Sequence, residues 1–295
     1  MDSFDRAVQA NQTFAVIDKH ARSQAGCPAP FLLDIVRGEW TRRAETWCDP
    51  NPEETTLVRK TLLTLAVDAC HRHIPWVVME IDEAPDAFVF DLIPDHFGMD
   101  TSIVQRLRRV VAQVKSEPLR DFLSNVFSLS MVYRHFWKCP ASQWHHHAYA
   151  GGLAIHSIEM AEWMADTPEL SGTDRDIGVV FALLHDIGKL WCYGEREFTH
   201  YQDLTHELTG VAKISQPLDA LDAAWPHGFV VLTSLLSGLW KSKRDKPLLA
   251  IGEIVQRYDQ SSVRRDLRNQ KGARHQRWNA KPCAGNVRPI RPDWQ

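Results

Sequence analysis

The sequence predicts a mainly α-helical protein with a small mixed α/β N-terminal region and a flexible basic C-terminal tail. From Ser102 onward, apolar residues recur three and four positions apart, which is the period of an amphipathic helix. The β-rich runs precede that point. The last 25 residues or so contain several Gly and Pro without any period. We therefore divide the chain into residues 1–118, 119–266 and 267–295.

The N-terminal region predicts one helix and one hairpin. Residues 54–72 carry leucines and alanines at a spacing that predicts a helix. Residues 76–81 and 87–92 are β-rich, and the turn signal Glu83-Ala84-Pro85-Asp86 lies between them. This pattern predicts a short hairpin.

Helices account for most of the remaining chain. Apolar spacing predicts one helix after Ser102 and a second over about 119–136, followed by three more at 151–166, 176–187 and 247–259. Asp174 or Asp176 is a suitable N-cap for the helix at 176–187, and Gly188 is a suitable stop.

Composition limits the class of protein. The chain has 295 residues, of which 44% are hydrophobic and 24% charged, as in ordinary globular proteins. Its longest apolar run, 229–240, is too short and too polar to cross a bilayer, and its first residues lack a signal-peptide pattern. These features predict a cytoplasmic protein without a membrane partner. Six scattered cysteines form no CxxC pair, so histidine and carboxylate are the expected metal ligands.

The charge is distributed unevenly. Residues 261–295 hold nine Lys or Arg against two Asp, although the whole chain carries −3. Basic side chains contact phosphates and indoles stack on bases, so the tail offers nucleic-acid contacts. A solvated, disordered end is the alternative. The candidate contacts are Arg264, Arg265, Arg268, Lys271, Arg274, Arg277 and Trp278.

Ionisable residues end several apolar stripes. The nearly apolar run 177–184 leads directly into His185-Asp186, and burying such a pair is costly unless the two groups are paired or bind a metal. Asp259 ends a stripe of apolar residues spaced by four, and His156 lies on a mostly apolar face. Each residue alone could be an ordinary satisfied polar group. Three such helices together favour a site for a divalent metal.

The same residues carry a resemblance to a known family. His156, His185-Asp186 and Asp259 match the H…HD…D pattern of HD-domain metal-dependent phosphohydrolases. Residues 139–157 resemble the PAS-x-x-HHHAY-x-GGL-x-x-HS segment in the HD domain of TraI-type (MobH-class) conjugative relaxases. They are also similar to the HHAY-x-GGL-x-x-H segment of YhaM-type 3′–5′ exoribonucleases. Residues 181–189 match the ALLHDIGK helix end, and the resemblance covers about 119–266.

This resemblance implies an HD-domain helical bundle that binds one or two divalent ions (Mn, Fe, Mg or Ni). The implied metal ligands are His156, His185, Asp186, Asp259 and, in a dinuclear site, His206. The implied catalytic residues are Asp186, Lys189 and His206, with Lys189 placed to meet a phosphate. Further candidates for the site are His145, His146, His147 and His227. YhaM-type enzymes also carry an N-terminal oligonucleotide-binding barrel, for which two β-rich runs are too few here.

The expected function is therefore that of a TraI-like HD-domain nuclease or phosphodiesterase. Its expected substrate is single-stranded DNA or RNA, with a link to conjugative DNA transfer. One alternative is an HD-type hydrolase of nucleotides or small phosphates. Another is a non-catalytic remnant HD domain with a role in interactions.

Overall fold

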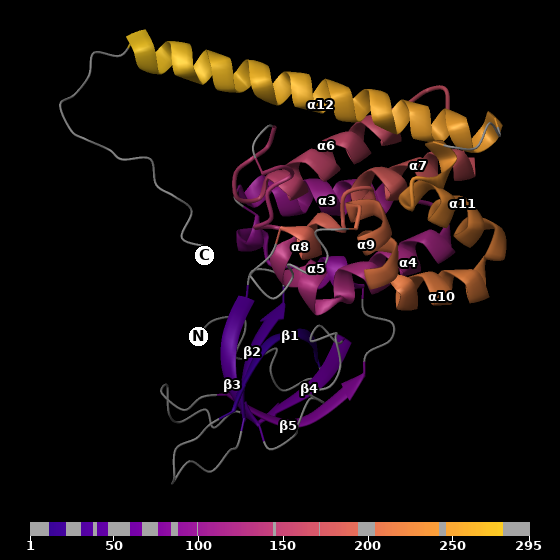
Figure 1. Ribbon diagram of the computed structural model, residues 1–295. Helices are drawn as coiled ribbons and strands as arrows, with labels where there is room; N and C mark the ends of the chain where they lie inside the picture. The colour runs from indigo at the N-terminus through magenta and orange to yellow at the C-terminus, as the bar shows by residue number, and fades with distance from the viewer. Residues whose placement is uncertain are drawn as a thin grey trace. The chain divides into compact units, whose positions relative to one another are not determined.

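The computed structural model (Figure 1) describes residues 12–21, 31–37, 40–46, 60–66, 76–83, 88–98, 100–143, 146–170, 172–193, 204–241 and 246–279. The chain forms two compact units. The first comprises residues 1–108 together with 123–134, and the second comprises 109–122 together with 135–295. Each unit is described by itself.

The first unit contains a closed five-stranded barrel, with strand order β1-β2-β3-β5-β4. All neighbouring strands are antiparallel except β3 and β5, which are parallel. Leu33 and Ile35 alternate along β2 and are buried, as expected for one face of a strand. The strands are β1 (Gln12–Ala21), β2 (Phe31–Arg37), β3 (Trp40–Thr46), β4 (Lys60–Ala66) and β5 (Trp76–Glu83).

The barrel corrects three expectations about the N-terminal region. Within the predicted helix 54–72, residues 60–66 form a strand, because β4 pairs with β1 on one side and with β5 on the other. The predicted hairpin is also wrong, since β5 pairs with β3 and β4 while Val89–Leu92 forms helix α2. The barrel is complete because three more strands lie in residues 12–46, where no strand was expected.

Residues 123–134 pack against the segment that follows the barrel strands. That segment contains α2 and the 3₁₀ helix η1 (Asp95–Phe97). The rings of Phe90 and Phe127 lie 5.0 Å apart, and the Tyr133 hydroxyl donates to the carbonyl of Leu92 at 3.0 Å. Arg108 donates to the carbonyl of Phe90 at 2.9 Å. These contacts fix the chain just after the strands.

The helices predicted after Ser102 are confirmed, although the one expected over about 119–136 is divided into two, α4 and α5. The helices are α3 (Thr101–Gln113), α4 (Glu117–Ser128), α5 (Ser130–His135), α6 (Gly152–Ala165), α7 (Gly172–Leu184), α8 (Lys189–Cys192), α9 (His206–Lys213), α10 (Ser215–Ala224), α11 (Pro226–Leu236), the 3₁₀ helix η3 (Leu239–Lys241) and α12 (Lys246–Asn279). No helix among the described residues is long and apolar enough to cross a bilayer.

Two details of these helices differ from expectation. Because α7 begins at Gly172, neither Asp174 nor Asp176 is its N-cap. Instead, Asp176 accepts hydrogen bonds from the backbone N–H groups of Lys115 and Ser116, both at 2.8 Å, just before α4. The tail is the second difference: α12 continues to Asn279, so residues 267–279 are helical. Residues 280–295 lie outside the described residues.

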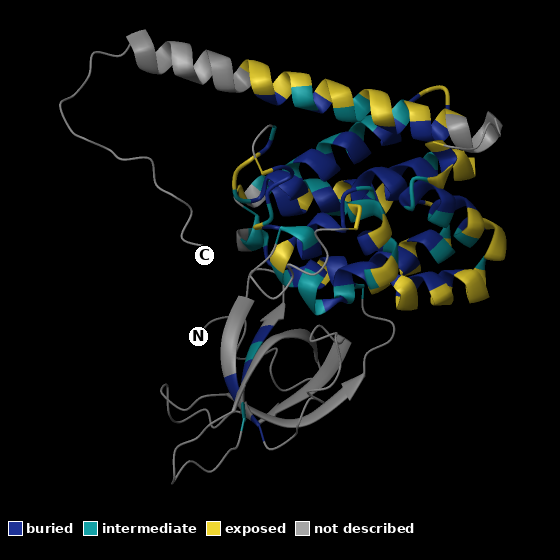
Figure 2. Ribbon diagram, viewed as in Figure 1, coloured by how far each residue is buried: buried dark blue, intermediate teal, exposed yellow. Residues whose placement is uncertain are grey.

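The core of the second unit is built on α6 and α7, which pack against each other. Residues 176–184 of α7 are buried throughout, consistent with their nearly continuous apolar sequence. Helix α12 lies along α6 and α7 with one exposed face (Figures 1 and 2). Helices α6, α7 and α12 therefore pack together, and the ionisable residues lie where these helices meet.

Candidate metal centre

Four side chains from α6, from the turn after α7 and from α12 converge in the second unit. The His156 Nε2 atom lies 3.3 Å from the Asp259 Oδ1 and 3.8 Å from the Asp186 Oδ2. The His185 Nε2 atom lies 3.2 Å from the same Asp186 oxygen. His156 and Asp186 are buried, whereas Asp259 is partly exposed. The structure thus brings together residues more than 100 positions apart.

The turn after α7 sets the direction of His185 and Asp186. The backbone N–H of His185 donates to Phe181 at 2.8 Å, which extends the last helical turn. The Nδ1 atom of His185 lies 2.9 Å from the carbonyl of Ala182 and can only donate to it, so the proton sits on Nδ1 in the neutral ring. The Nε2 lone pair then faces the centre, as in histidines that bind a metal.

Gly188 allows His206 to reach this turn. A Cβ atom at position 188 would lie 1.8 Å from the carbonyl oxygen of His206, which is a severe overlap. Glycine therefore lets the start of α9 approach the turn. As a result, the His206 Nε2 lies 3.1 Å from the Asp186 Oδ1. This close approach accounts for the glycine of the HDIGK motif in this chain.

The loop before α6 brings His146 to the centre. A Cβ at Gly152 would lie 2.0 Å from the carbonyl oxygen of His147, so the loop can cross the helix start only over a glycine. The same carbonyl accepts a hydrogen bond from the N–H of Ala141 at 3.1 Å. His146 offers a ligand atom within 4.8 Å of ligand atoms of His156 and Asp259.

Electrostatics at the centre favour the ionised form of Asp186. Burial alone would raise its pKa, but His185, Lys189 and His206 hold the pKa well below the usual value of 3.8. Burial would similarly raise the pKa of Asp259, but the neighbouring imidazoles of His156 and His185 lower it. The two carboxylates are therefore negative at neutral pH.

Burial and neighbouring charges shift the pKa values of the nitrogen bases at the centre in different directions. Burial would lower the pKa of His185 and of Lys189, but in both cases Asp186 outweighs burial and raises the pKa. The pKa of His146 is lowered, first by burial and then by the charges of His156 and Lys189. His146 is therefore neutral at pH 7.

The centre fits a divalent cation. The Nε2 atoms of His156 and His185 are buried and make no hydrogen bond of good geometry to the described residues, although carboxylate oxygens lie 3.3 and 3.2 Å away. When both rings are neutral with their protons on Nδ1, these nitrogens and the carboxylates are acceptors facing acceptors, and a cation between them satisfies both. Imidazole and carboxylate ligands suit divalent first-row metals. The residues that fit as ligands are His146, His156, His185, Asp186 and Asp259.

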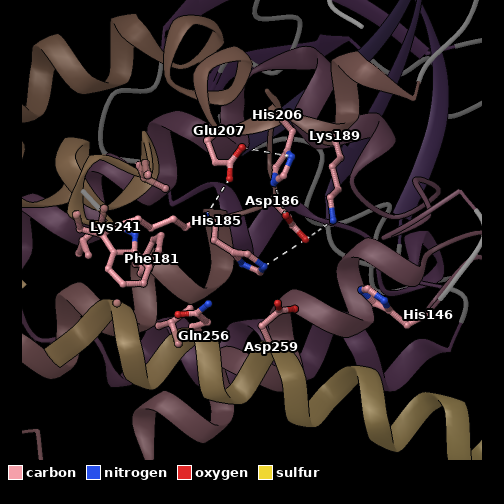
Figure 3. Close-up of a pocket in the computed structure, with 16 residues that line it drawn as sticks. His146, Phe181, His185, Asp186, Lys189, His206, Glu207, Lys241, Gln256 and Asp259 are labelled. Carbon is pink, nitrogen blue, oxygen red and sulfur yellow. Dashed lines mark hydrogen bonds and ion pairs between the residues drawn. The ribbon is translucent and has the colours of Figure 1, made fainter. Parts of the chain in front are cut away.

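A pocket of about 230 Å³ opens beside the centre (Figure 3). His185 and Asp186 lie across the pocket from Asp259, which projects from α12, and Lys189, His206 and His146 also line it. The other lining residues are mostly apolar, with a few polar groups: Phe181, Leu235, Leu236, Gly238, Trp240, Gly252 and Val255, with Glu207, Lys241 and Gln256.

The remaining histidine candidates lie in different places. His147 is buried and bonds to Tyr149 and Ser262, outside the pocket lining. His227 is exposed at the start of α11, with its ring 6.4 Å from that of Trp225, and it does not line the pocket. His145 lies outside the described residues.

The lysine and arginine candidates also lie in different places. The Lys189 ammonium is buried and donates to Asp186 Oδ2 and to the carbonyl of Ala141, both at 2.6 Å. Arg264, Arg265 and Arg268 are exposed on α12. The helix also contains residues whose side chains lie outside the description: Lys271, Arg274, Arg277 and Trp278.

Sequence reasoning missed several polar residues around the centre. Glu207 accepts from the Lys241 ammonium at 3.2 Å on the pocket wall. The Ser262 hydroxyl donates to Glu159 at 2.8 Å in a partly buried contact. Each of these two lies three residues after a predicted metal ligand on the same helix. Because residues at i and i+3 share a helix face, this spacing was a signal that could have revealed them.

The helical unit and its His/Asp centre mark the chain as a distant homologue of HD-domain phosphohydrolases. It is similar to the 3′–5′ exoribonuclease YhaM of Shouchella clausii, with 23% identity over 235 residues, covering 70% of this chain and 64% of the relative. It is also similar to the dihydroneopterin 2′,3′-cyclic phosphate phosphodiesterase of Methanocaldococcus jannaschii. There the identity is 34% over 149 residues, covering 42% of this chain and 59% of the relative.

The chain thus spans less than two thirds of the length of both curated relatives. No family model matches the chain. No solved structure matches it either.

Proposed function

We propose that the protein is a metal-dependent phosphodiesterase that cleaves nucleic acid. The observation that carries this proposal is the convergence of His156, His185, Asp186 and Asp259 beside an open pocket. Both relatives are named for reactions at phosphodiester bonds, one in RNA and one in a cyclic phosphate. The shared chemistry supports hydrolysis at phosphorus as the reaction class.

The residues of the centre have different roles in this proposal. His156, His185, Asp186 and Asp259 would hold one divalent cation, and His206 with Asp186 would contribute to a second. Such a cation supplies Lewis acidity and makes water a nucleophile near neutral pH. In a site with a single cation, His206 would instead be placed to give a proton to a leaving oxygen, from the pocket wall 3.1 Å from Asp186. His146, which is neutral because burial lowers its pKa, can accept a proton.

Lys189 has a more indirect role in this proposal than the sequence suggested. Its ammonium is held by Asp186 and by the carbonyl of Ala141, so the position of Asp186 depends on it. The resemblance implied that Lys189 meets a phosphate directly. We propose that it acts first as the counter-ion that orients Asp186 toward the centre.

Three observations support a polynucleotide substrate. The match to the exoribonuclease covers 70% of the chain and therefore extends beyond residues 119–295, which make up about 60% of it. A five-stranded barrel is also the architecture of the oligonucleotide-binding fold. Exposed arginines on α12 add phosphate-binding charge. Single-stranded RNA or DNA is the substrate class we propose.

A hydrolase of small phosphates is the second candidate. The higher identity, 34%, is to a cyclic phosphate phosphodiesterase, and a pocket of about 230 Å³ suits a small ligand. A role in conjugative transfer is a narrower hypothesis that rests on residues 139–157 alone. We therefore leave it outside the proposal.

The proposal is tested with purified protein that has been treated with chelator and then supplied with Mn²⁺, Fe²⁺, Mg²⁺ or Ni²⁺. We expect hydrolysis of labelled single-stranded RNA or DNA with at least one metal, and no hydrolysis after chelation or in Asp186→Ala. Preferential turnover of 2′,3′-cyclic nucleotides would favour the second candidate. Equal activity in Asp186→Ala would overturn metal-dependent catalysis at this centre.

A further inference from the structure

Ser262 occupies a buried junction behind the metal centre. It lies on α12, three residues after Asp259, and its side chain is fully buried. Its hydroxyl oxygen lies 2.8 Å from Glu159 Oε2, 3.0 Å from His156 Nδ1 and 3.2 Å from His147 Nε2. One hydroxyl thus meets a carboxylate and two imidazoles.

Counting protons fixes the direction of these hydrogen bonds. A carboxylate can only accept, so the single Ser262 proton goes to Glu159. The hydroxyl oxygen then has only lone pairs left, and both imidazoles must donate to it. In neutral rings, His156 therefore carries its proton on Nδ1 and His147 carries its proton on Nε2.

Groups around the junction agree with this assignment. With its proton on Nε2, His147 presents a bare Nδ1, which accepts from the Tyr149 hydroxyl at 2.8 Å. The other Glu159 oxygen accepts from the Arg265 guanidinium at 2.7 Å, so both carboxylate oxygens are engaged as acceptors. All these groups are satisfied by one pattern of protons.

Asp266 holds the junction in place. Its carboxylate accepts a hydrogen bond from the backbone N–H of His147 at 2.8 Å. His147 has a left-handed backbone conformation, with φ of 46°. Asp259, Ser262 and Asp266 lie three and four residues apart, on one face of α12. The same helix face therefore supplies a candidate ligand, the junction and an anchor for the loop that carries His146.

We propose that Ser262, oriented by Glu159, is a positioning residue that holds His156 in the tautomer whose Nε2 lone pair faces the metal. The opposite tautomer would place a proton on Nε2, between His156 and the two carboxylates. Hydrogen bonds of this kind behind a metal-ligating histidine typically change metal affinity by about 10-fold to 100-fold. The inference rests on the proposed function, because it concerns a metal held at the same centre.

The test compares two neighbouring serines. Ser262→Ala removes the junction, whereas Ser261→Ala removes an exposed hydroxyl that donates to the carbonyl of Arg257. Mn²⁺ binding to chelator-treated protein is measured by titration calorimetry. We expect Ser262→Ala to bind Mn²⁺ about 10-fold to 100-fold more weakly than wild type, and Ser261→Ala to bind it as wild type does.

A spectroscopic readout separates tautomer from general damage. In metal-free wild-type protein, ¹⁵N NMR of the imidazoles should show the His156 proton on Nδ1. Glu159→Gln keeps the shape of the side chain but places an amide N–H toward Ser262, because Arg265 retains the amide oxygen. The Ser262 proton can then turn to His156 Nδ1, the nearer of the two imidazole nitrogens at 3.0 Å, and we expect the His156 proton to move from Nδ1 to Nε2. This variant also carries the test if Ser262→Ala does not fold.

The outcomes distinguish the inference from the function. Ser262→Ala that binds Mn²⁺ as tightly as wild type, or a His156 proton found on Nε2 in wild type, overturns the inference alone. A wild-type protein that binds no divalent metal overturns the proposed function.

Discussion

Replacing Asp186 should expose how strongly it is coupled to Lys189. Both side chains are buried, and the ammonium donates to the carboxylate at 2.6 Å. Asp186→Asn keeps the shape but removes the negative charge, so the ammonium remains buried without its counter-ion. Lys189→Met in the same chain removes that stranded charge. We expect the double variant to be more stable than Asp186→Asn alone.

The expected magnitude follows from burial. Removing one partner of a buried ion pair costs about 3–5 kcal/mol, while replacing both by neutral groups of similar volume is often close to neutral. The coupling energy between the two substitutions should therefore exceed about 1 kcal/mol, within the range seen for directly contacting residues. Lys241 provides the matched control, because its side chain is 55% exposed and pairs with Glu207 at the pocket wall. Lys241→Met should cost no more than about 1 kcal/mol.

The assay is urea denaturation followed by circular dichroism at pH 7, with chelator present so that bound metal does not add to stability. Four proteins are needed: wild type, the two single variants and the double variant. If the two effects simply add, the Lys189 charge is not held by Asp186. The ammonium would then be available to a phosphate, as the sequence suggested, and the counter-ion role would be refuted.

Two further predictions concern a glycine and a histidine. Gly188→Ala should push α9 away and separate His206 from Asp186, which lowers metal stoichiometry and activity. Gly172→Ala, which has a positive φ of 51° but open space around its Cβ position, should cost roughly 1–2 kcal/mol of stability and leave both measurements unchanged. The pKa of His147 is lowered from 6.5 to about 4, mainly by burial. The unfolded chain therefore binds the proton more readily between these values, and the free energy of unfolding should fall by up to about 3 kcal/mol from pH 6.5 to pH 4. Denaturation of metal-free wild type and His147→Gln tests this, and an equal pH slope in both would contradict it.

The helical half of the fold was predictable because its signals are local. The run 177–184 is apolar on all sides, and the structure buries it between neighbouring helices. The barrel gave no comparable signal. Its closure depends on pairing β1 with β4 and β3 with β5, segments separated by long stretches of chain. Leu62, Leu63 and Leu65 satisfy a helical pattern as well as a strand, so only the pairing partners decide between the two.

The candidate site was also predictable only in part. The candidate ligands could be found because ionisable residues interrupt apolar stripes on helices. Such a stripe faces the core, so a residue within it also faces inward. Their partners could not be assigned, because these depend on how turns direct the chain. Lys189 was expected to face substrate, but the turn after His185 directs its ammonium to Asp186 and Ala141. Ser262 was not singled out, although it lies three residues after Asp259 within one continuous helix.

That continuity changes the meaning of the basic segment. A flexible tail could bring its arginines to any distance from the centre. In a helix, by contrast, each residue advances about 1.5 Å. Arg268 is nine residues after Asp259, so its backbone lies about 14 Å further along the α12 axis. The exposed arginines at 264 and 268 are one turn apart, and the Arg268 guanidinium donates to the Arg264 carbonyl at 3.4 Å. At 3.6 residues per turn, both arginines lie on the side of α12 opposite Asp259, so a strand bound at the centre would reach this charge only by passing around the helix.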